Sequence, residues 1–85
     1  MIVKARLFAS FREAVGAAVL ELELGPRPTV GDLLTVLRRD YPRLGRTVAS
    51  AMVAVNLEYV GPEFELSEHD EVAIIPPVSG GARDL

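Results

Sequence analysis

The segment TVGDLLTVLRRDY, residues 29–41, predicts the main helix around which the rest of the chain is arranged. Thr29 is the expected N-cap, and Asp32 follows near the positive end of the helix dipole. Two arginines in the last turn and Pro42 after it indicate where the helix ends. The apolar residues recur at helical spacing and form one stripe: Val30, Leu33, Leu34, Leu37 and Tyr41.

Two segments of alternating apolar and charged residues precede this helix and predict a pair of strands. They lie at residues 3–7 and 20–24, and each is expected to bury one face. Between them, SFRE at residues 10–13 has the form of a capping box, with Ser10 as the N-cap of a short helix. Gly16 is expected to end that helix in a left-handed conformation. The two strands should therefore pair as a hairpin around a short helix.

The segments that follow the main helix predict a loop and three more strands. Residues 43–50 are expected to form the loop, and the apolar run 51–55 predicts a strand that is buried on both faces. Asn56 suits the positive φ of a tight turn, from which residues 57–60 return as a short strand. Residues 72–75 predict the last strand. Two apolar residues of the intervening segment are expected to pack back on the core: Phe64 and Leu66.

The order of these elements is strand, strand, helix and then three strands, which predicts an α+β fold. A hairpin followed by a helix that crosses one face gives a mixed sheet of four to five strands packed on one main helix. This arrangement is the β-grasp, or ubiquitin-like, fold. The 85 residues suffice for one core. We assign residues 1–77 to the β-grasp domain and residues 78–85 to a flexible C-terminal tail with a Gly-Gly pair and a four-residue extension.

Composition excludes several kinds of chemistry. The absence of cysteine excludes disulfides, a thiol nucleophile and a thiolate metal site. His69 is the only histidine, and it is not accompanied by carboxylates or cysteines at the spacing typical of metal ligands, so no metal site is expected. Residues 47–82 contain no lysine or arginine and carry six carboxylates. This acidic half argues against nucleic acid or an anionic membrane as a partner, because both need phosphate neutralisation, and it is compatible with a basic protein partner.

Hydropathy gives no sign of a membrane segment. The longest apolar runs are only a few residues, too short to span a bilayer. Lys4 and Arg6 lie where a signal peptide would have its apolar region, so a cytoplasmic location is expected.

The segment PPVSGG, residues 76–81, leaves the last strand without a charged side chain. Its two prolines lack amide donors and fix φ, so they stop strand pairing and project the chain as a stiff arm. Gly80 and Gly81 have no side chains and can pass through a narrow channel. An uncharged arm can also enter a dry site without burying an unpaired charge. This pattern is typical of a substrate rather than of a catalyst.

Three segments resemble the small subunit of molybdopterin synthase, the MoaD family of sulfur carriers: FASFREAVG at 8–16, AVN at 54–56 and DEVAIIPPVSGG at 70–81. The resemblance runs from residue 2 to residue 81 and implies a non-catalytic sulfur-donor subunit. The resemblance implies a reaction cycle in which the carboxylate of Gly81 is adenylated and converted to a thiocarboxylate. The thiocarboxylate then gives its sulfur to a pterin precursor in the large synthase subunit, as a step of molybdenum cofactor biosynthesis.

The resemblance also implies the functional residues. Gly81 is the expected acyl-adenylate and thiocarboxylate site. The arm that enters the partner's channel is expected to comprise Pro77, Val78, Ser79 and Gly80. A partner interface is expected beside the arm, at Phe8, Phe11, Arg12 and Ile75. Ile74 and Ile75 alternate faces on the last strand, so one of the two is expected in the core.

The partners follow from the same cycle. The chain itself binds no cofactor, and ATP and Mg²⁺ are used by an activating partner. We expect a hetero-oligomer with the large synthase subunit, an ATP-dependent adenylating enzyme and a sulfur donor of desulfurase or rhodanese type. Residues 82–85, ARDL, occupy the carboxylate of Gly81 in an amide bond, so a peptidase is expected to remove them.

Three other functions stay open at this point. The chain can serve as the sulfur carrier for another product, namely thiamine, a thiolated tRNA base or a sulfur amino acid. It can also be a ubiquitin-like modifier that is joined to lysines through Gly81. The third alternative is a non-covalent β-grasp interaction module in which the Gly-Gly pair is incidental.

Overall fold

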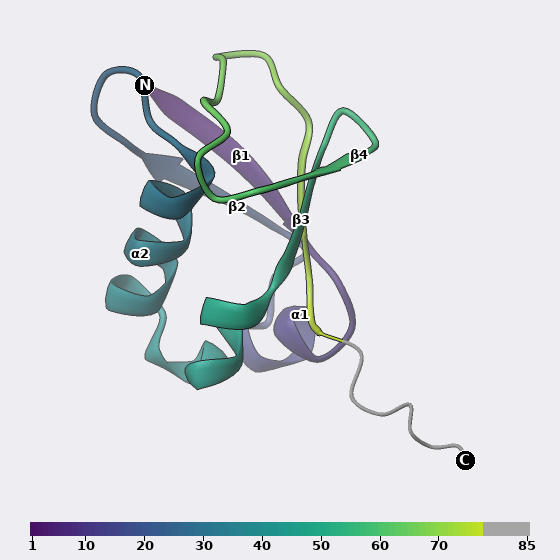
Figure 1. Ribbon diagram of the computed structural model, residues 1–85. Helices are drawn as coiled ribbons and strands as arrows, with labels where there is room; N and C mark the ends of the chain where they lie inside the picture. The colour runs from purple at the N-terminus through teal and green to yellow at the C-terminus, as the bar shows by residue number, and fades with distance from the viewer. Residues whose placement is uncertain (78–85) are drawn as a thin grey trace.

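The computed structural model describes residues 1–77, in which one mixed five-stranded sheet is crossed by a helix (Figure 1). The strand order is β2-β1-β5-β3-β4, with β1 and β5 parallel and the other neighbours antiparallel. This confirms the predicted β-grasp fold. The elements are β1 Ile2–Leu7, α1 Ala9–Val15, β2 Val19–Glu23, α2 Val30–Asp40, the 3₁₀ segments η1 Pro42–Leu44 and η2 Arg46–Ser50, β3 Met52–Val55, β4 Glu58–Val60 and β5 Val72–Ile75.

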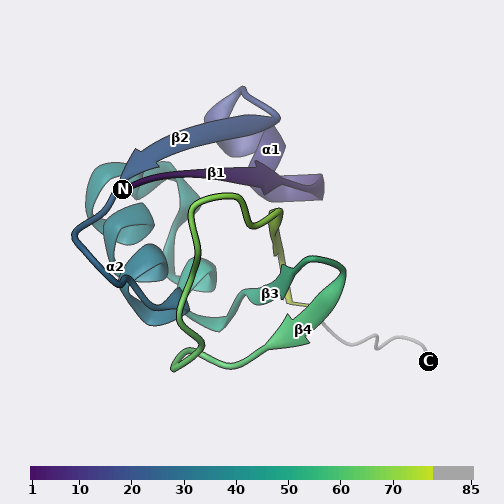
Figure 2. The same cartoon turned by 90° about the horizontal axis from the view of Figure 1, so that it is seen from above.

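The first two strands form the predicted hairpin around α1. Their antiparallel register runs from Ile2↔Glu23 to Arg6↔Val19. Seen from above, this hairpin lies on one side of the molecule, and the β3–β4 hairpin lies on the other (Figure 2). In the sheet formed by residues 1–77, the two hairpins are therefore joined only through β5, which pairs with β1 and with β3.

The start of α1 differs from the prediction, whereas its end agrees with it. The helix begins at Ala9 with Phe8 as the N-cap residue, and no side chain caps it. The predicted capping box at Ser10 is wrong, because β1 leads into the helix so directly that Ser10 already lies inside the first turn. Gly16 ends the helix with φ 83°, and its N–H donates to the Arg12 carbonyl at 2.8 Å, as predicted.

The main helix α2 has the predicted cap and apolar stripe. The Asp32 N–H donates to Thr29 Oγ1 at 3.1 Å, and the Thr29 N–H donates to Asp32 Oδ2 at 2.9 Å, which completes a capping box. The helix ends at Asp40, one residue before the C-cap Tyr41. Three residues of the stripe are fully buried and two are partly buried; the buried ones are Val30, Leu33 and Leu37.

Residues 43–50 are more ordered than predicted. They form η1 and η2 rather than an irregular loop, and two apolar side chains in them, Leu44 and Val48, join the core. Leu44 and Val48 are surrounded by mostly polar residues in the sequence, so no apolar periodicity predicts their burial. No helix within residues 1–77 has the length and apolar character that a membrane crossing requires.

Two expectations about burial after the main helix are wrong. β3 is buried on one face only, because no layer within residues 1–77 covers the outer face of the sheet: Val53 is buried, whereas Met52 is 37% exposed. Leu66 packs into the core as predicted, but Phe64 is 39% exposed.

Candidate functional site

The strand that leads into the arm lies in the middle of the sheet. Ile74 of β5 is fully buried toward α2, and Ile75 is half-buried on the outer face, so one isoleucine is in the core as predicted. Pro76 and Pro77 are also half-buried. The other predicted site residues of the arm, Val78, Ser79, Gly80 and Gly81, lie outside the described residues, as does the extension at 82–85.

Hydrogen bonds fix the point at which β5 begins. Asn56, at φ 53°, donates from Nδ2 to Asp70 Oδ1 at 3.0 Å and accepts from the Glu71 N–H at 3.0 Å. The backbone N–H of Asn56 donates to the Glu71 carbonyl at 2.8 Å, and Asp70 Oδ2 accepts from the Ser67 N–H at 2.7 Å. These contacts tie the β3–β4 turn to the start of β5. They also join two segments that carry the family resemblance, 54–56 and 70–81.

The outer face of β5, β3 and β4 is apolar, and we call it the apolar half. Ala73 lies opposite Ala54, which lies opposite Tyr59, and these two alanines form a shallow floor. A hollow of about 250 Å³ opens above this floor, bordered by Phe8 and Leu57, with Arg6 and Glu71 on the side that faces β1 and the start of β5. Leu57 is 92% exposed and Tyr59 is 65% exposed. Large apolar side chains exposed together mark a surface for a protein partner.

The structure separates the four residues predicted at the partner interface. Phe8 and Ile75 lie beside or within the apolar half, and their contact with a partner stays a prediction. Phe11 is only 2% exposed because it lies on the inward side of α1 and packs in the core, so its assignment to the interface is wrong. Arg12 is exposed on α1 and does not line the hollow.

Three apolar residues of this face were absent from the predicted interface: Met52, Leu57 and Tyr59. A signal for two of them was present in the sequence. The run 51–55 places an apolar side chain on both faces of its strand, and a leucine directly after Asn56 is an unusual residue for a tight turn.

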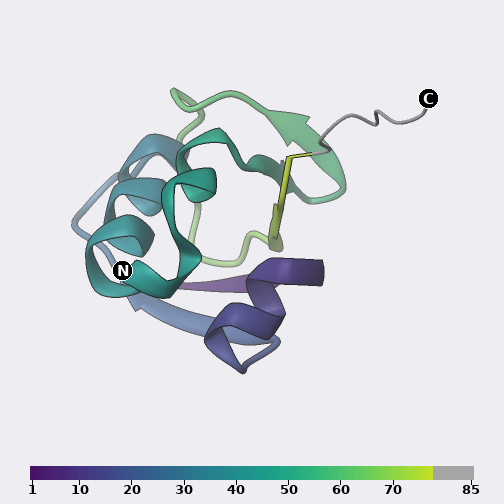
Figure 3. The ribbon, with the colours of Figure 1, turned by 90° about the horizontal axis from the view of Figure 1, so that it is seen from below.

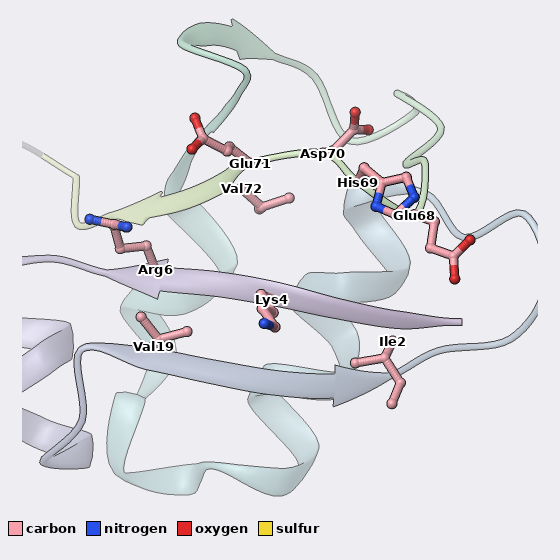
Figure 4. Close-up of a pocket in the computed structure, with 9 residues that line it drawn as sticks. All are labelled: Ile2, Lys4, Arg6, Val19, Glu68, His69, Asp70, Glu71 and Val72. Carbon is pink, nitrogen blue, oxygen red and sulfur yellow. The ribbon is translucent and has the colours of Figure 1, made fainter.

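The outer face of β1 and β2 is charged, and we call it the charged half. It carries Lys4, Arg6, Glu21 and Glu23, with Lys4 Nζ 3.9 Å from Glu21 Oε2. Two exposed apolar residues, Ile2 and Val19, lie at opposite ends of this face, each opposite a charged residue. A hollow of about 500 Å³ lies between β1 and residues 68–71, because β1 pairs with β5 only from Ala5 to Leu7. Figure 4 shows Lys4 and Arg6 on β1 below this gap and Glu68 and His69 at its far end. The mixture of mostly exposed cationic and anionic side chains that lines this hollow is typical of a solvated surface.

Comparison with known proteins gives a consistent result. The model of the ThiS family matches residues 5–81. A molybdopterin synthase sulfur carrier subunit of Chlamydomonas reinhardtii is 40% identical over 83 residues, which cover 95% of this chain and 100% of that protein. Small archaeal modifier protein 3 of Haloferax volcanii is 32% identical over 92 residues, which cover 95% of this chain and 100% of that protein.

A solved structure agrees in fold as well as in sequence. The putative molybdopterin converting factor, subunit 1, of Pyrococcus furiosus matches with a TM-score of 0.80 at 30% identity, covering 92% of this chain and 99% of that chain. These findings confirm the resemblance that three short segments of the sequence predicted. The chain therefore belongs to the ThiS family, and within it resembles the sulfur carrier subunits of molybdopterin synthase.

Proposed function

We propose that this chain is the sulfur carrier subunit of a molybdopterin synthase and carries its sulfur as a thiocarboxylate on Gly81. The observation that carries the proposal is the 40% identity to a molybdopterin synthase sulfur carrier subunit across that protein's whole length. The match to the ThiS family extends to Gly81 and therefore includes the Gly-Gly pair.

The chemistry at Gly81 needs two activation steps. A carboxylate oxygen of Gly81 attacks the α-phosphorus of Mg²⁺-bound ATP in the adenylating enzyme, and pyrophosphate leaves. The terminal sulfur of a persulfide on a desulfurase- or rhodanese-type donor then displaces AMP from the acyl-adenylate and forms an acyl disulfide with the donor. A second thiol reduces this S–S bond, which releases the thiocarboxylate and leaves a disulfide between that thiol and the donor. After its sulfur has passed to the pterin precursor, addition of water restores the carboxylate. Because Gly81 is bonded to Ala82 in the sequence, a peptidase must first release its carboxylate.

The apolar half is the surface that we propose for docking on the large synthase subunit. It lies on the outer face of β5, the strand that leads into the arm, so a partner seated there is placed to receive residues 77–81. The name of the Chlamydomonas relative, a subunit of a synthase, supports a hetero-oligomer. Burial of Leu57 and Tyr59 in such a complex would remove from water the two large apolar side chains of residues 1–77 with the highest exposed fractions.

Intact mass tests the proposal. The chain that ends at Gly81 and the chain of residues 1–85 are each incubated with the adenylating enzyme, ATP, Mg²⁺ and the sulfur donor. We expect only the shorter chain to release pyrophosphate and to gain the mass of one sulfur in exchange for one oxygen. A chain of residues 1–85 that is intact by mass at the end and still supports sulfur transfer would contradict the processing step.

A second candidate function is supported by a specific observation, the 32% identity to small archaeal modifier protein 3 of Haloferax volcanii. A protein modifier would use the same activated Gly81 carbonyl, with a lysine amine in place of the sulfur nucleophile. Mass spectrometry of lysates from the native cell distinguishes the two functions. Isopeptide-linked Gly-Gly remnants on other proteins would support the modifier, and a thiocarboxylate alone would support the sulfur carrier.

A further inference from the structure

Arginines gather at one end of the described chain, on elements that contact one another. They come from α1, the last turn of α2, η1 and η2, and we call them the arginine end: Arg12, Arg38, Arg39, Arg43 and Arg46. All five are exposed. The same elements contribute two carboxylates near them, Glu13 and Asp40, which leaves an excess of three positive charges. The rest of residues 1–77 has three cationic side chains against nine carboxylates, an excess of six negative charges.

Within residues 1–77 the positive charge of this end is largely uncompensated. Arg39 is the member that forms an ion pair there, from Nε to Asp40 Oδ1 at 2.8 Å, and this hydrogen bond lowers the pKa of the Asp40 carboxyl. The other four have no carboxylate of the described residues within ion-pair distance. Exposed guanidinium groups without partners are well suited to bind carboxylates of another molecule, because their planar donors match the two carboxylate oxygens.

The arginine end is also the end of the molecule from which the arm begins. Figure 1 shows α1, the 3₁₀ segments and the end of β5 together at the lower end of the sheet, and Figure 3 views this end from below. Contacts between α1 and both η1 and β5 agree with these views. Carboxylates of residues 63–71 lie toward the opposite end of β5, because that segment leads into its first residue, Val72. The described molecule is thus a dipole whose positive end lies beside the start of the arm.

A hollow with a partly apolar lining lies at the arginine end, next to Arg43. It has a volume of about 310 Å³ and is lined by Val15, Asp40, Tyr41, Pro42 and Arg43. Tyr41 and Val15 are half-buried, so each presents part of an apolar surface to the hollow. Asp40, the one carboxylate in the lining, is already paired with Arg39. A hollow with an apolar wall and the Arg43 guanidinium at its edge, at the end of the molecule that carries the other four arginines, fits a segment that combines one apolar side chain with neighbouring carboxylates.

We infer that the arginine end docks an acidic segment of the large subunit beside the entrance that receives the arm, with an apolar side chain of that segment in the hollow at Tyr41. This inference rests on the proposed function, because it names the surface by which that same partner is approached. Attraction at the arginine end and repulsion of the acidic remainder turn the molecule so that the arm arrives first. Steering of this kind raises the association rate and weakens with salt.

Association kinetics with the purified large subunit test the inference. The variant Arg38→Gln/Arg43→Gln removes two positive charges from the arginine end. The control Arg27→Glu makes the net charge more negative by the same amount at the far end of the molecule, where Arg27 Nε lies 3.0 Å from Glu65 Oε2. At low salt we expect the double variant to associate about tenfold more slowly than the parent chain, and the control to stay within about twofold. In about 1 M salt, where the Debye length falls to about 3 Å, the three rates should converge.

Circular dichroism of all three chains checks that they share one fold. Equal slowing of the double variant and the control would overturn the inference, because net charge rather than the position of the arginines would then set the rate. A double variant that associates as fast as the parent chain at low salt would overturn it as well. Failure of the parent chain to bind the large subunit at any salt concentration would instead contradict the proposed function, and this inference with it.

Discussion

The two halves of the outer sheet face differ in what they present, although they belong to one sheet. The charged half, on β1 and β2, exposes Lys4 and Arg6 between buried residues, and Lys4 Nζ lies 3.9 Å from Glu21 Oε2. Its exposed apolar residues, Ile2 and Val19, are separated by these charges. The apolar half, on β5, β3 and β4, places small alanines at its centre and Leu57 and Tyr59 at its rim. Neither half is covered by another layer of residues 1–77.

This difference distinguishes the residues that stabilise the sheet from those that are explained by binding to a partner. Alternation of charged and buried residues is sufficient to keep β1 and β2 solvated on one face and packed on the other. The apolar half departs from that pattern on its exposed face, and nothing in the described core benefits from the departure. A surface that keeps large apolar side chains in water without packing them is explained by a partner that covers them.

The strongest test of the difference between the two halves is to introduce a carboxylate into each of them. Ala73→Glu puts a carboxylate at the centre of the apolar half, whereas Val19→Glu puts one on the outer face of β2. We expect the first change to weaken binding to the large subunit at least about 100-fold, because a desolvated carboxylate without a partner costs several kcal/mol. The second change should have little effect. Calorimetric titration measures both, and equal losses would show that the two halves do not differ.

The next largest effect is expected at the turn that holds the apolar half together. Asn56→Ala removes both side-chain hydrogen bonds to residues 70–71. Alanine is also less favourable than asparagine at a φ of 53°, because it lacks the polar side chain that stabilises asparagine in the left-handed conformation. We expect the free energy of unfolding to fall by about 2 kcal/mol in urea titrations.

Asn56→Gly is the matched variant, because glycine tolerates the positive φ but lacks the amide. The glycine variant should recover part of the loss, and the remainder measures the hydrogen bonds to Asp70 and Glu71. Equal stability of the alanine variant and the parent chain would mean that the turn does not depend on these contacts.

Leu57 offers a way to lower binding without lowering stability. It is almost fully exposed and adopts φ 72°, a conformation in which asparagine is more favourable than leucine. Leu57→Asn should therefore leave the melting temperature unchanged or higher, while the dissociation constant for the large subunit rises about tenfold. A variant that loses stability and binding in parallel would assign Leu57 to the fold and not to the partner surface.

The smallest effect is expected in the charged half. Lys4→Ala removes an exposed ion pair whose atoms are 3.9 Å apart. Such pairs contribute between about 0 and 1 kcal/mol, so the free energy of unfolding should change by less than about 0.5 kcal/mol. Binding to the large subunit should be unaffected at physiological salt. A clear loss of binding would extend the docking surface onto β1.

Local patterns in the sequence predicted those parts of the fold that depend on near neighbours. The capping box of Thr29 and Asp32 and the left-handed Gly16 are set by residues within a turn of each other. The start of α1 was missed because pairing of β1 with two other strands, and not the local SFRE pattern, determines where the strand gives way to the helix.

Burial at the candidate site was harder to predict for the same reason. Whether Phe11 points into the core or toward a partner depends on how α1 packs against the sheet, which no local pattern contains. Leu57 lies on a turn whose neighbours on the outer face come from β5 and the end of β1. The arm itself was identified from composition alone, because prolines and glycines restrict or free the backbone wherever they occur.

The central position of β5 has a consequence for how the chain folds. β5 is the last strand of residues 1–77, and within them it alone pairs with both the β1–β2 hairpin and the β3–β4 hairpin. During synthesis the first 70 residues can form two separate ribbons and a helix, but the continuous sheet has to wait for Val72–Ile75. Pairing between β1 and β5 closes a loop of more than 60 residues, and such long-range contacts are slow to form. We therefore expect the sheet to be completed only after Val72–Ile75 has left the ribosome, so that the strand that leads into the arm is also the strand that closes the sheet.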